Sequence, residues 1–207
     1  MKTLFSLLLA VAATTNAAAI ISVSAPNPSV AAGSAVNAAS WTQTGSYSNV
    51  SVAAVLSNFS GVGAGLAMHA YLTNQIGAGT TVANEIASTA FTLSPGNAQN
   101  VTLFNNLTLG TGTYFLVLLL DNGTTAQGGW AADVPTVVTD SGVTHGADRF
   151  ATTAAGYAPA TVMSTSTAGQ RLLFDVTSND VSVPEPAAVG IVSLALVLIL
   201  GRTIRRR

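Results

Sequence analysis

The chain of 207 residues contains no cysteine and few charged side chains. Without cysteine it forms neither a disulfide nor a thiolate metal site. Charged residues make up 7% of the chain, and the span between residues 20 and 182 has no lysine. That span carries two arginines against seven acidic residues, a net charge of −5. Because a nucleic-acid partner needs a basic patch, we expect none here.

The N-terminal residues have the pattern of a signal peptide. Lys2 precedes an apolar run over residues 4–13, which is about half the ~20 residues needed to span a bilayer. The small residues Ala17 and Ala19 then form an A-x-A cleavage site. We expect signal peptidase to cut after Ala19, which makes residues 1–19 a signal peptide and the rest an exported chain.

Residues 20–178 predict one all-β domain. Short runs of β-branched and aromatic residues alternate with clusters of Gly, Asn, Ser and Pro. About eight or nine such runs predict a two-sheet antiparallel sandwich of jelly-roll or immunoglobulin-like type. The uncharged surface that the composition implies is typical of an extracellular β-rich domain. The clearest strands are residues 50–56, 66–73, 101–107, 112–120 and 171–177.

Two local patterns carry further predictions. Residues 114–120 are apolar on both faces and are followed by a turn, which predicts a central strand of the sandwich. Residues 81–87 predict a short helix with Thr81 as N-cap and Glu85 in its first turn. In the strand 66–73, alternation places His69 and Tyr71 together on the wetter face.

The C-terminal residues differ in composition from the domain. A polar tether begins at residue 179 and ends in a motif that the prolines hold extended. Residues 187–204 are apolar and predict one transmembrane helix. The basic stub 205–207 stays in the cytoplasm by the positive-inside rule. The motif residues are Val183, Pro184, Glu185 and Pro186, and the stub residues are Arg205, Arg206 and Arg207.

In this order, the tail resembles the PEP-CTERM sorting signal of bacterial exosortase substrates. The resemblance covers the tail alone, and it implies an exopolysaccharide-producing bacterium as host. It also implies that an exosortase-like enzyme recognises Pro184, Glu185 and Pro186 and cuts nearby. The precursor is then a single-pass inner-membrane protein, and the domain is released or transferred to the cell surface or the extracellular matrix. A structural or adhesive role without catalysis is the function we expect.

The segment after Trp130 gathers the residues most suited to a binding site. Asp133, Asp140, His145 and Asp148 lie within sixteen residues of a Gly- and Thr-rich stretch. Carboxylates in such a loop can hold Ca²⁺ through their oxygens, and Trp130 can stack on a sugar ring. The spacing fits neither an EF-hand nor a nonapeptide calcium motif, however, and the alternative interpretation is that Asp148 and Arg149 form an exposed charge pair.

Two other functions remain open. A carbohydrate-binding module predicts an exposed aromatic side chain, for which Trp41, Trp130 and Tyr157 are the candidates. A secreted hydrolase predicts two carboxylates, or a Ser-His pair, within catalytic reach, although the chain has no Gly-x-Ser-x-Gly motif. The glycine-rich residues 61–65 lack the third glycine of a dinucleotide loop, so we interpret them as a loop between strands.

Overall fold

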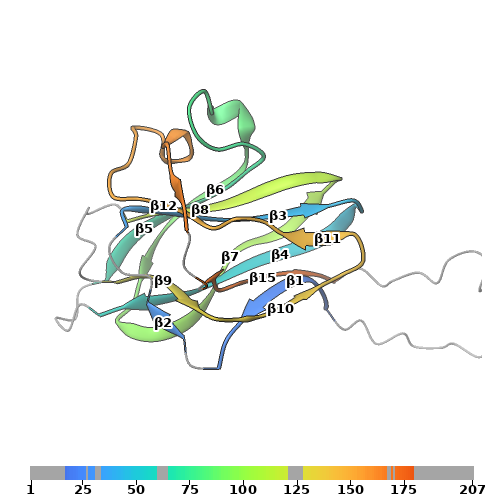
Figure 1. Cartoon of the computed structure of the whole chain (residues 1–207), viewed down its shortest axis with the longest axis horizontal. Helices are drawn as coiled ribbons and strands as arrows, with labels where there is room; N and C mark the ends of the chain where they lie inside the picture. The colour runs from blue at the N-terminus through green and yellow to red at the C-terminus, as the bar shows by residue number, and fades with distance from the viewer. Residues whose placement is uncertain are drawn as a thin grey trace, which may run out of the picture. The chain divides into compact units, whose positions relative to one another are not determined.

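Two antiparallel sheets enclose a shared apolar core, which confirms the all-β prediction (Figure 1). The structure, a computed structural model, describes residues 17–26, 28–30, 34–59, 65–120, 128–166, 169 and 171–179. All of these residues belong to one unit, Ala17–Asp180. Within them no helix is long and apolar enough to cross a membrane. The predicted transmembrane segment 187–204 lies outside the described residues.

The first sheet has eight strands. They are β1 (Ala18–Ser24), β2 (Ser29–Val30), β4 (Tyr47–Asn58), β7 (Gly96–Leu109), β9 (Gly128–Asp133), β10 (Thr136–Thr139), β14 (Arg171–Leu172) and β15 (Phe174–Ser178). Their order is β10-β1-β15-β4-β9-β14, with β2 beside β9 and β7 beside β4. The first strand of the domain, β1, and the last, β15, are therefore neighbours.

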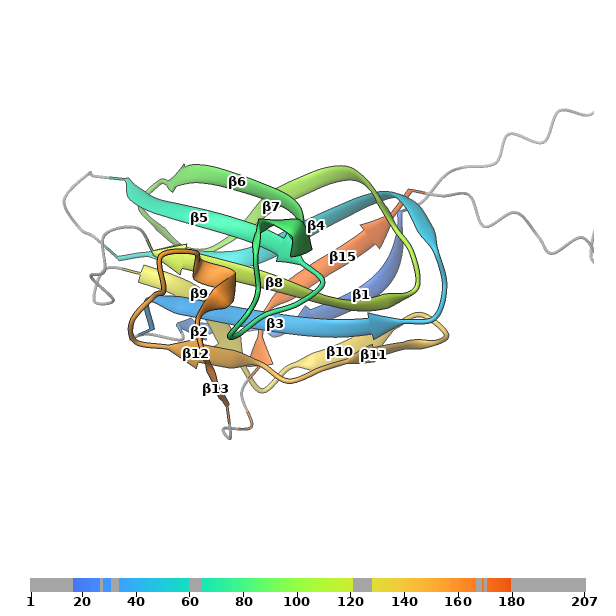
Figure 2. The same ribbon diagram turned by 90° about the horizontal axis from the view of Figure 1, so that it is seen from above.

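The second sheet has seven strands. They are β3 (Val36–Gln43), β5 (Leu66–Thr73), β6 (Glu85–Leu93), β8 (Gly112–Leu120), β11 (Val143–His145), β12 (Arg149–Ala151) and β13 (Ser164–Thr165). Their order is β13-β12-β3-β8-β5-β6, with β11 beside β3. Figure 2 shows β6 and β13 at opposite sides of this sheet.

The inner faces of both sheets supply the main core. Trp41 and Leu116 from the second sheet and Val52 and Phe174 from the first are all completely buried in it. The rings of Trp41 and Phe174 meet with their centroids 5.8 Å apart, so the two sheets are in direct contact. Each large side chain buried in this way stabilises the fold by about 1.5–3 kcal/mol.

The strand β8 is central, as its apolar sequence predicts, because it lies between β3 and β5. Its inward residues Leu116 and Leu118 join the main core, while Val117 on the opposite face joins a second buried cluster. That cluster includes Ala158, which belongs to the 3-10 turn η2 (Ala158–Ala160), and Met163. A loop therefore covers the outer face of β8, which explains why the strand has no polar side.

The predicted strands agree with the structure in position, with two differences in extent. Residues 66–73 and 112–120 match β5 and β8, while β4 and β7 extend beyond the predicted residues 50–56 and 101–107. The predicted strand 171–177 is divided at Leu173 into β14 and β15. There the Leu173 amide donates to Ala131 of β9, so the chain changes partners at this residue.

The helix expected over residues 81–87 is wrong beyond its first turn. Val82–Asn84 forms the 3-10 turn η1, and Glu85 begins β6 instead of continuing a helix. The amide of Thr81 donates to the side-chain oxygen of Asn84 at 3.0 Å, which closes the turn on itself. The following residues alternate between exposed and half-buried positions, and this period-two pattern favours a strand.

Candidate functional site

A half-buried histidine and a buried aspartate lie where the second sheet meets the end of the first. His145 ends β11 opposite Trp41 of β3, and its ring lies 5.9 Å from the ring of Phe174. Asp148 lies directly before the first residue of β12, and only 2% of its surface is exposed. Its Oδ2 accepts a hydrogen bond from the Leu172 amide of β14 at 2.9 Å. The carboxyl group of Asp148 thus connects the two sheets.

The two side chains approach each other without a hydrogen bond. His145 Nε2 and Asp148 Oδ1 are 3.6 Å apart, and neither atom has another partner among the described residues. Burial raises the pKa of Asp148 to about 6. The hydrogen bond from the Leu172 amide and the positive charge of Arg171 lower this pKa, but burial has the larger effect. Burial also lowers the pKa of His145, and the positive charge of Arg171 lowers it further. Asp148 therefore changes its charge near pH 6.

The three aspartates of the predicted cation site have separate surroundings. Asp133 ends β9 in register with Arg171, and its Oδ1 accepts from the Val134 amide at 2.7 Å. Asp140 is exposed and accepts from the hydroxyl of Tyr47 at 3.0 Å. In the described part of the chain, no group of three or more His, Cys, Asp or Glu side chains is placed to hold a metal ion. The structure therefore does not bring Asp133, Asp140 and Asp148 together as the predicted calcium site requires.

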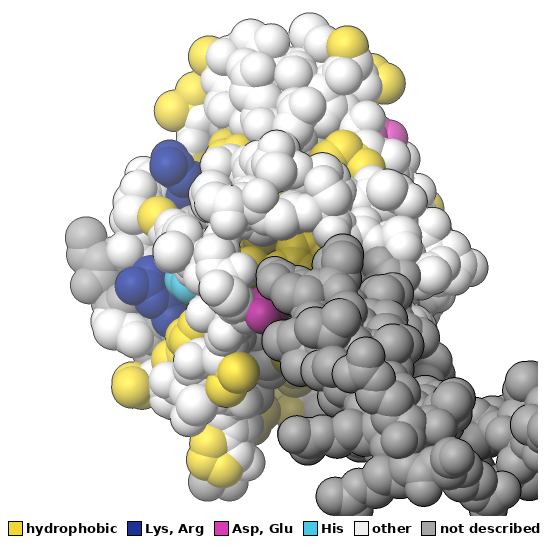
Figure 3. All heavy atoms as spheres, turned by 90° about the vertical axis from the view of Figure 1, so that its right-hand side faces the viewer, with side chains coloured by type: hydrophobic (Ala, Val, Ile, Leu, Met, Phe, Trp, Pro, Cys, Tyr) yellow, Lys and Arg dark blue, Asp and Glu magenta, His cyan; other side chains and the backbone are white. Residues whose placement is uncertain are grey.

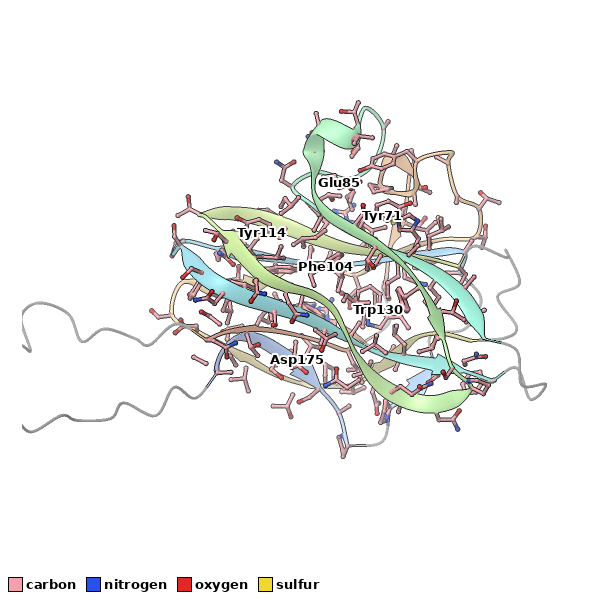
Figure 4. The ribbon with its side chains drawn as sticks, turned by 180° about the vertical axis from the view of Figure 1, so that it is seen from behind. Tyr71, Glu85, Phe104, Tyr114, Trp130 and Asp175 are labelled. Carbon is pink, nitrogen blue, oxygen red and sulfur yellow. The ribbon has the colours of Figure 1, made fainter. Side chains whose placement is uncertain are left out.

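The predicted sugar-stacking role of Trp130 is corrected by its burial. Trp130 is completely buried in the main core, and its Nε1 donates to the Leu173 carbonyl at 2.7 Å. Trp41 is equally buried and donates to the side chain of Gln43 at 3.0 Å. Because both indoles are internal and satisfied, neither offers a face to a saccharide. Figure 4 shows Trp130 among the side chains between the sheets.

The third aromatic candidate, Tyr157, is half-buried on the outer face of the second sheet. Its hydroxyl donates to Glu85 Oε2 at 2.9 Å, and its ring meets Tyr71 edge-on with centroids 5.6 Å apart. His69 stacks on Tyr71 at 4.3 Å, which confirms that these two residues share a face. Burial, followed by the hydrogen bond to Glu85, raises the pKa of Tyr157. Sequence reasoning missed this cluster because it placed Glu85 in a helix.

The described surface contains two shallow clefts away from the predicted residues. The larger, about 520 Å³, lies beside the β7–β8 turn and is lined by Tyr114, three threonines and Ile86. The smaller, about 240 Å³, is lined by Arg149 and Met163. In Figure 3 most of the visible surface is uncharged, and a histidine lies beside an arginine. The hydroxyl-rich turn residues were visible in the sequence, but nothing marked them as a cleft.

The residues of the predicted sorting signal, Val183–Pro186 and Arg205–Arg207, lie outside the described part of the chain, as do residues 61–64 of the glycine-rich loop. The predicted signal-peptidase site is described. Ala17 and Ala19 are exposed, and β1 begins between them at Ala18. Ala18 pairs with Ser178 and Ala19 with Thr177 of β15. Cleavage after Ala19 would therefore remove only the first two positions of this ladder.

Comparison with known proteins gives no match at any level: no family model fits the chain, and neither a curated protein nor a solved structure matches it.

Proposed function

We propose that the chain is an exported surface or extracellular-matrix protein with a structural or adhesive role, sorted through a PEP-CTERM signal. The observation that carries this proposal is the order of features in the tail. A Val-Pro-Glu-Pro motif at residues 183–186 precedes the apolar residues 187–204 and the arginine stub 205–207. An N-terminal segment with the pattern of a signal peptide completes the arrangement.

The strand order supports this proposal independently of the tail sequence. Ala18 pairs with Ser178, so the signal-peptide junction and the start of the tether are neighbours. In the proposed precursor both hydrophobic ends enter the same membrane, and the domain must present both junctions on one side. The pairing of β1 with β15 meets this requirement without any further rearrangement of the domain.

The proposed topology extends beyond the described residues. Residues 187–204 form one transmembrane helix of about 27 Å, close to the ~30 Å hydrocarbon core. The arginine stub stays in the cytoplasm. The two-sheet domain, of jelly-roll or immunoglobulin-like type, then lies outside. Signal peptidase and an exosortase-like enzyme are the proposed processing partners, the inner membrane is a transient one, and an extracellular polysaccharide is the matrix ligand to be tested.

The alternative functions draw less support from the described residues. A carbohydrate-binding module loses Trp41 and Trp130 as platforms because both are buried. A hydrolase would use the closest acid-base pair, His145 and Asp148, but Asp148 is 2% exposed and therefore closed to a polymeric substrate. The sorting proposal needs neither site.

Mass spectrometry of both chain ends tests the proposal in an exopolysaccharide-producing host with an exosortase. We expect mature protein from the surface and medium to begin near Ile20 and to end near Pro186, or to carry extra mass there. A Pro184→Ala/Pro186→Ala variant should remain full-length in the membrane, while the neighbouring Ser182→Ala variant should be processed normally. Wild-type protein that still ends at Arg207 would overturn the proposal.

A further inference from the structure

The strand β6 is an edge of the second sheet. It pairs with β5 on one side over almost its full length, and no described strand pairs with its other side. The strand has nine residues and one charged side chain, Glu85, which lies at its start and is hydrogen-bonded to Tyr157. The remaining eight positions carry no charge and no proline. An edge of this kind offers unpaired backbone groups to another strand.

The other edges of the two sheets are protected or short. The strand β7 is interrupted by several register shifts against β4, and Ala98 and Asn106 have positive φ angles of 48° and 56°. Bulges of this kind prevent pairing with a second strand. Strand β10 has four residues, and β13 and β14 have two each. By contrast, the register of β6 is regular from Ala87 to Leu93, so β6 has the longest uninterrupted run of paired residues among the described edge strands.

The sequence of β6 is complementary to itself. In an antiparallel pair centred on Thr89, Ala87 lies opposite Phe91, and Ile86 lies opposite Thr92 of a second copy. Ser88 lies opposite Ala90 in the same register. A large side chain therefore meets a smaller one at the pairs 86/92 and 87/91. Glu85 lies opposite Leu93, and no two charges of one sign face each other. Because a two-fold axis requires the same patch on both copies, this match favours the chain itself as partner.

The inner face of β6 leaves apolar surface to be covered. Ala87 and Phe91 pack against the main core but are only half-buried. Ile86 on the other face is 37% exposed. Figure 4 looks onto this flank, where the strand that begins at Glu85 runs at the front of the molecule. A second β6 strand would place its Ala87 beside Phe91 and extend the cover of the core.

We propose that β6 pairs with β6 of a second copy of this chain, antiparallel and centred on Thr89, so that two seven-stranded sheets become one continuous sheet. The interaction is between backbones along the strand, and the side chains set its register. The proposal rests on described residues alone and does not depend on the sorting signal.

Cysteine cross-linking tests this register directly, because the natural chain has no cysteine. In the full-length Thr89→Cys variant the only thiol lies opposite itself, with β-carbons about 5 Å apart in the paired strands. We expect mild oxidation to convert most of this variant to a disulfide-linked dimer on a non-reducing gel. The matched control is Thr102→Cys, an exposed threonine on the bulged edge β7, which should stay monomeric.

A second variant separates strand pairing from random collision. Ala90→Lys puts a charge on the exposed face of β6, and a lysine on an edge strand opposes pairing. Adding it to Thr89→Cys should abolish the dimer, with circular dichroism unchanged. Equal cross-linking of Thr89→Cys and Thr102→Cys, or a dimer that survives Ala90→Lys, would overturn the proposal. A monomeric wild-type protein by light scattering, together with no Thr89→Cys dimer, would overturn it as well.

Discussion

Asp148 Oδ1 lies 3.6 Å from His145 Nε2 in a place where almost no solvent reaches the carboxyl group. The other carboxyl oxygen accepts from the Leu172 amide, so Asp148 joins the second sheet to β14. Since β14 pairs with β9, the contact closes the end of the first sheet against the loop between β11 and β12. A titratable group therefore adds a polar contact between two layers that are joined mainly by apolar packing, together with hydrogen bonds such as that from the Asn58 side-chain amide of β4 to the Leu93 carbonyl of β6.

The first prediction concerns the pH dependence of folding stability. The native pKa of Asp148 is raised from 3.8 to about 6. The native state thus binds this proton more tightly than the unfolded state, and the stability it contributes is complete below pH 3.8 and lost as pH rises through 6. The loss at pH 7.5 amounts to about 3 kcal/mol. Asp148→Asn avoids it, and should gain stability over wild type at pH 7.5 but not at pH 3.5, measured by urea unfolding.

A matched variant distinguishes charge from hydrogen bonding at this position. Asp148→Ala also removes the charge but leaves the Leu172 amide without its acceptor, which costs about 1–3 kcal/mol. It should be less stable than Asp148→Asn at both pH values. The lowered pKa of His145 acts in the opposite sense, because its contribution is present above pH 6.5 and is lost as pH falls. A pH-independent difference between Asp148→Asn and wild type would contradict the assignment.

The second prediction concerns the close approach of β9 to β4. A β-carbon on Gly128 would lie 2.3 Å from the backbone oxygen of Ser57. Because this oxygen belongs to the main chain, rotating a side chain cannot relieve the clash. Gly128→Ala should therefore destabilise the protein by about 1–3 kcal/mol, the range for overpacked positions. Gly110→Ala is the control, because its β-carbon would meet no heavy atom within 4 Å. Thermal unfolding of the two variants side by side makes the comparison, and equal melting temperatures would contradict it.

The third prediction uses the two buried tryptophans as reporters. Trp41 and Trp130 are completely buried, so the native protein should emit at short wavelength and resist quenching by acrylamide. Titration with the polysaccharides of a host matrix should leave this emission unchanged. Unfolding in urea should shift the emission to longer wavelength and restore quenching. Saccharide-dependent quenching in the native state would show an exposed indole and would revive the carbohydrate-binding alternative.

The sequence predicts those strands whose burial in the fold requires a recognisable pattern of apolar residues. In β5 the residues of one face, Leu66, Met68, Ala70 and Leu72, join the main core, and His69, Tyr71 and Thr73 alternate with them on the other face, so the strand shows a period of two. β8 was recognised because seven consecutive apolar residues can only be buried on both faces. By contrast, β3 was missed because it is also covered on both sides but is built from Ala, Ser and Asn. Small residues carry no periodicity, so their burial depends on contacts with β11, β12 and a loop that is distant in sequence.

The candidate site was predicted less well than the fold. Spacing brought Asp133, Asp140 and Asp148 together, but strand pairing separates them, since Asp133 lies opposite Arg171 and Asp140 contacts Tyr47. Burial of Trp130 depends on Leu173, which lies forty-three residues later in the chain. The Leu173 carbonyl accepts a hydrogen bond from the indole N–H of Trp130. Such long-range partners leave no mark in a local window of sequence. His145 and Asp148 do lie close together, as their spacing of three residues suggests, because this contact is local in the sequence.

The fourth prediction concerns the hydrogen bond from Tyr157 to Glu85, which ties the η2 loop to the start of β6. Tyr157→Phe keeps the edge contact with Tyr71 but removes the hydroxyl donor, and should cost about 1 kcal/mol. Glu85→Gln keeps an acceptor and should cost less. The raised pKa of Tyr157 means that its contribution is present below pH 10 and is lost as the pH rises further. Wild type should therefore approach Tyr157→Phe in stability above pH 10, and a double-mutant cycle with no coupling between the two positions would contradict the contact.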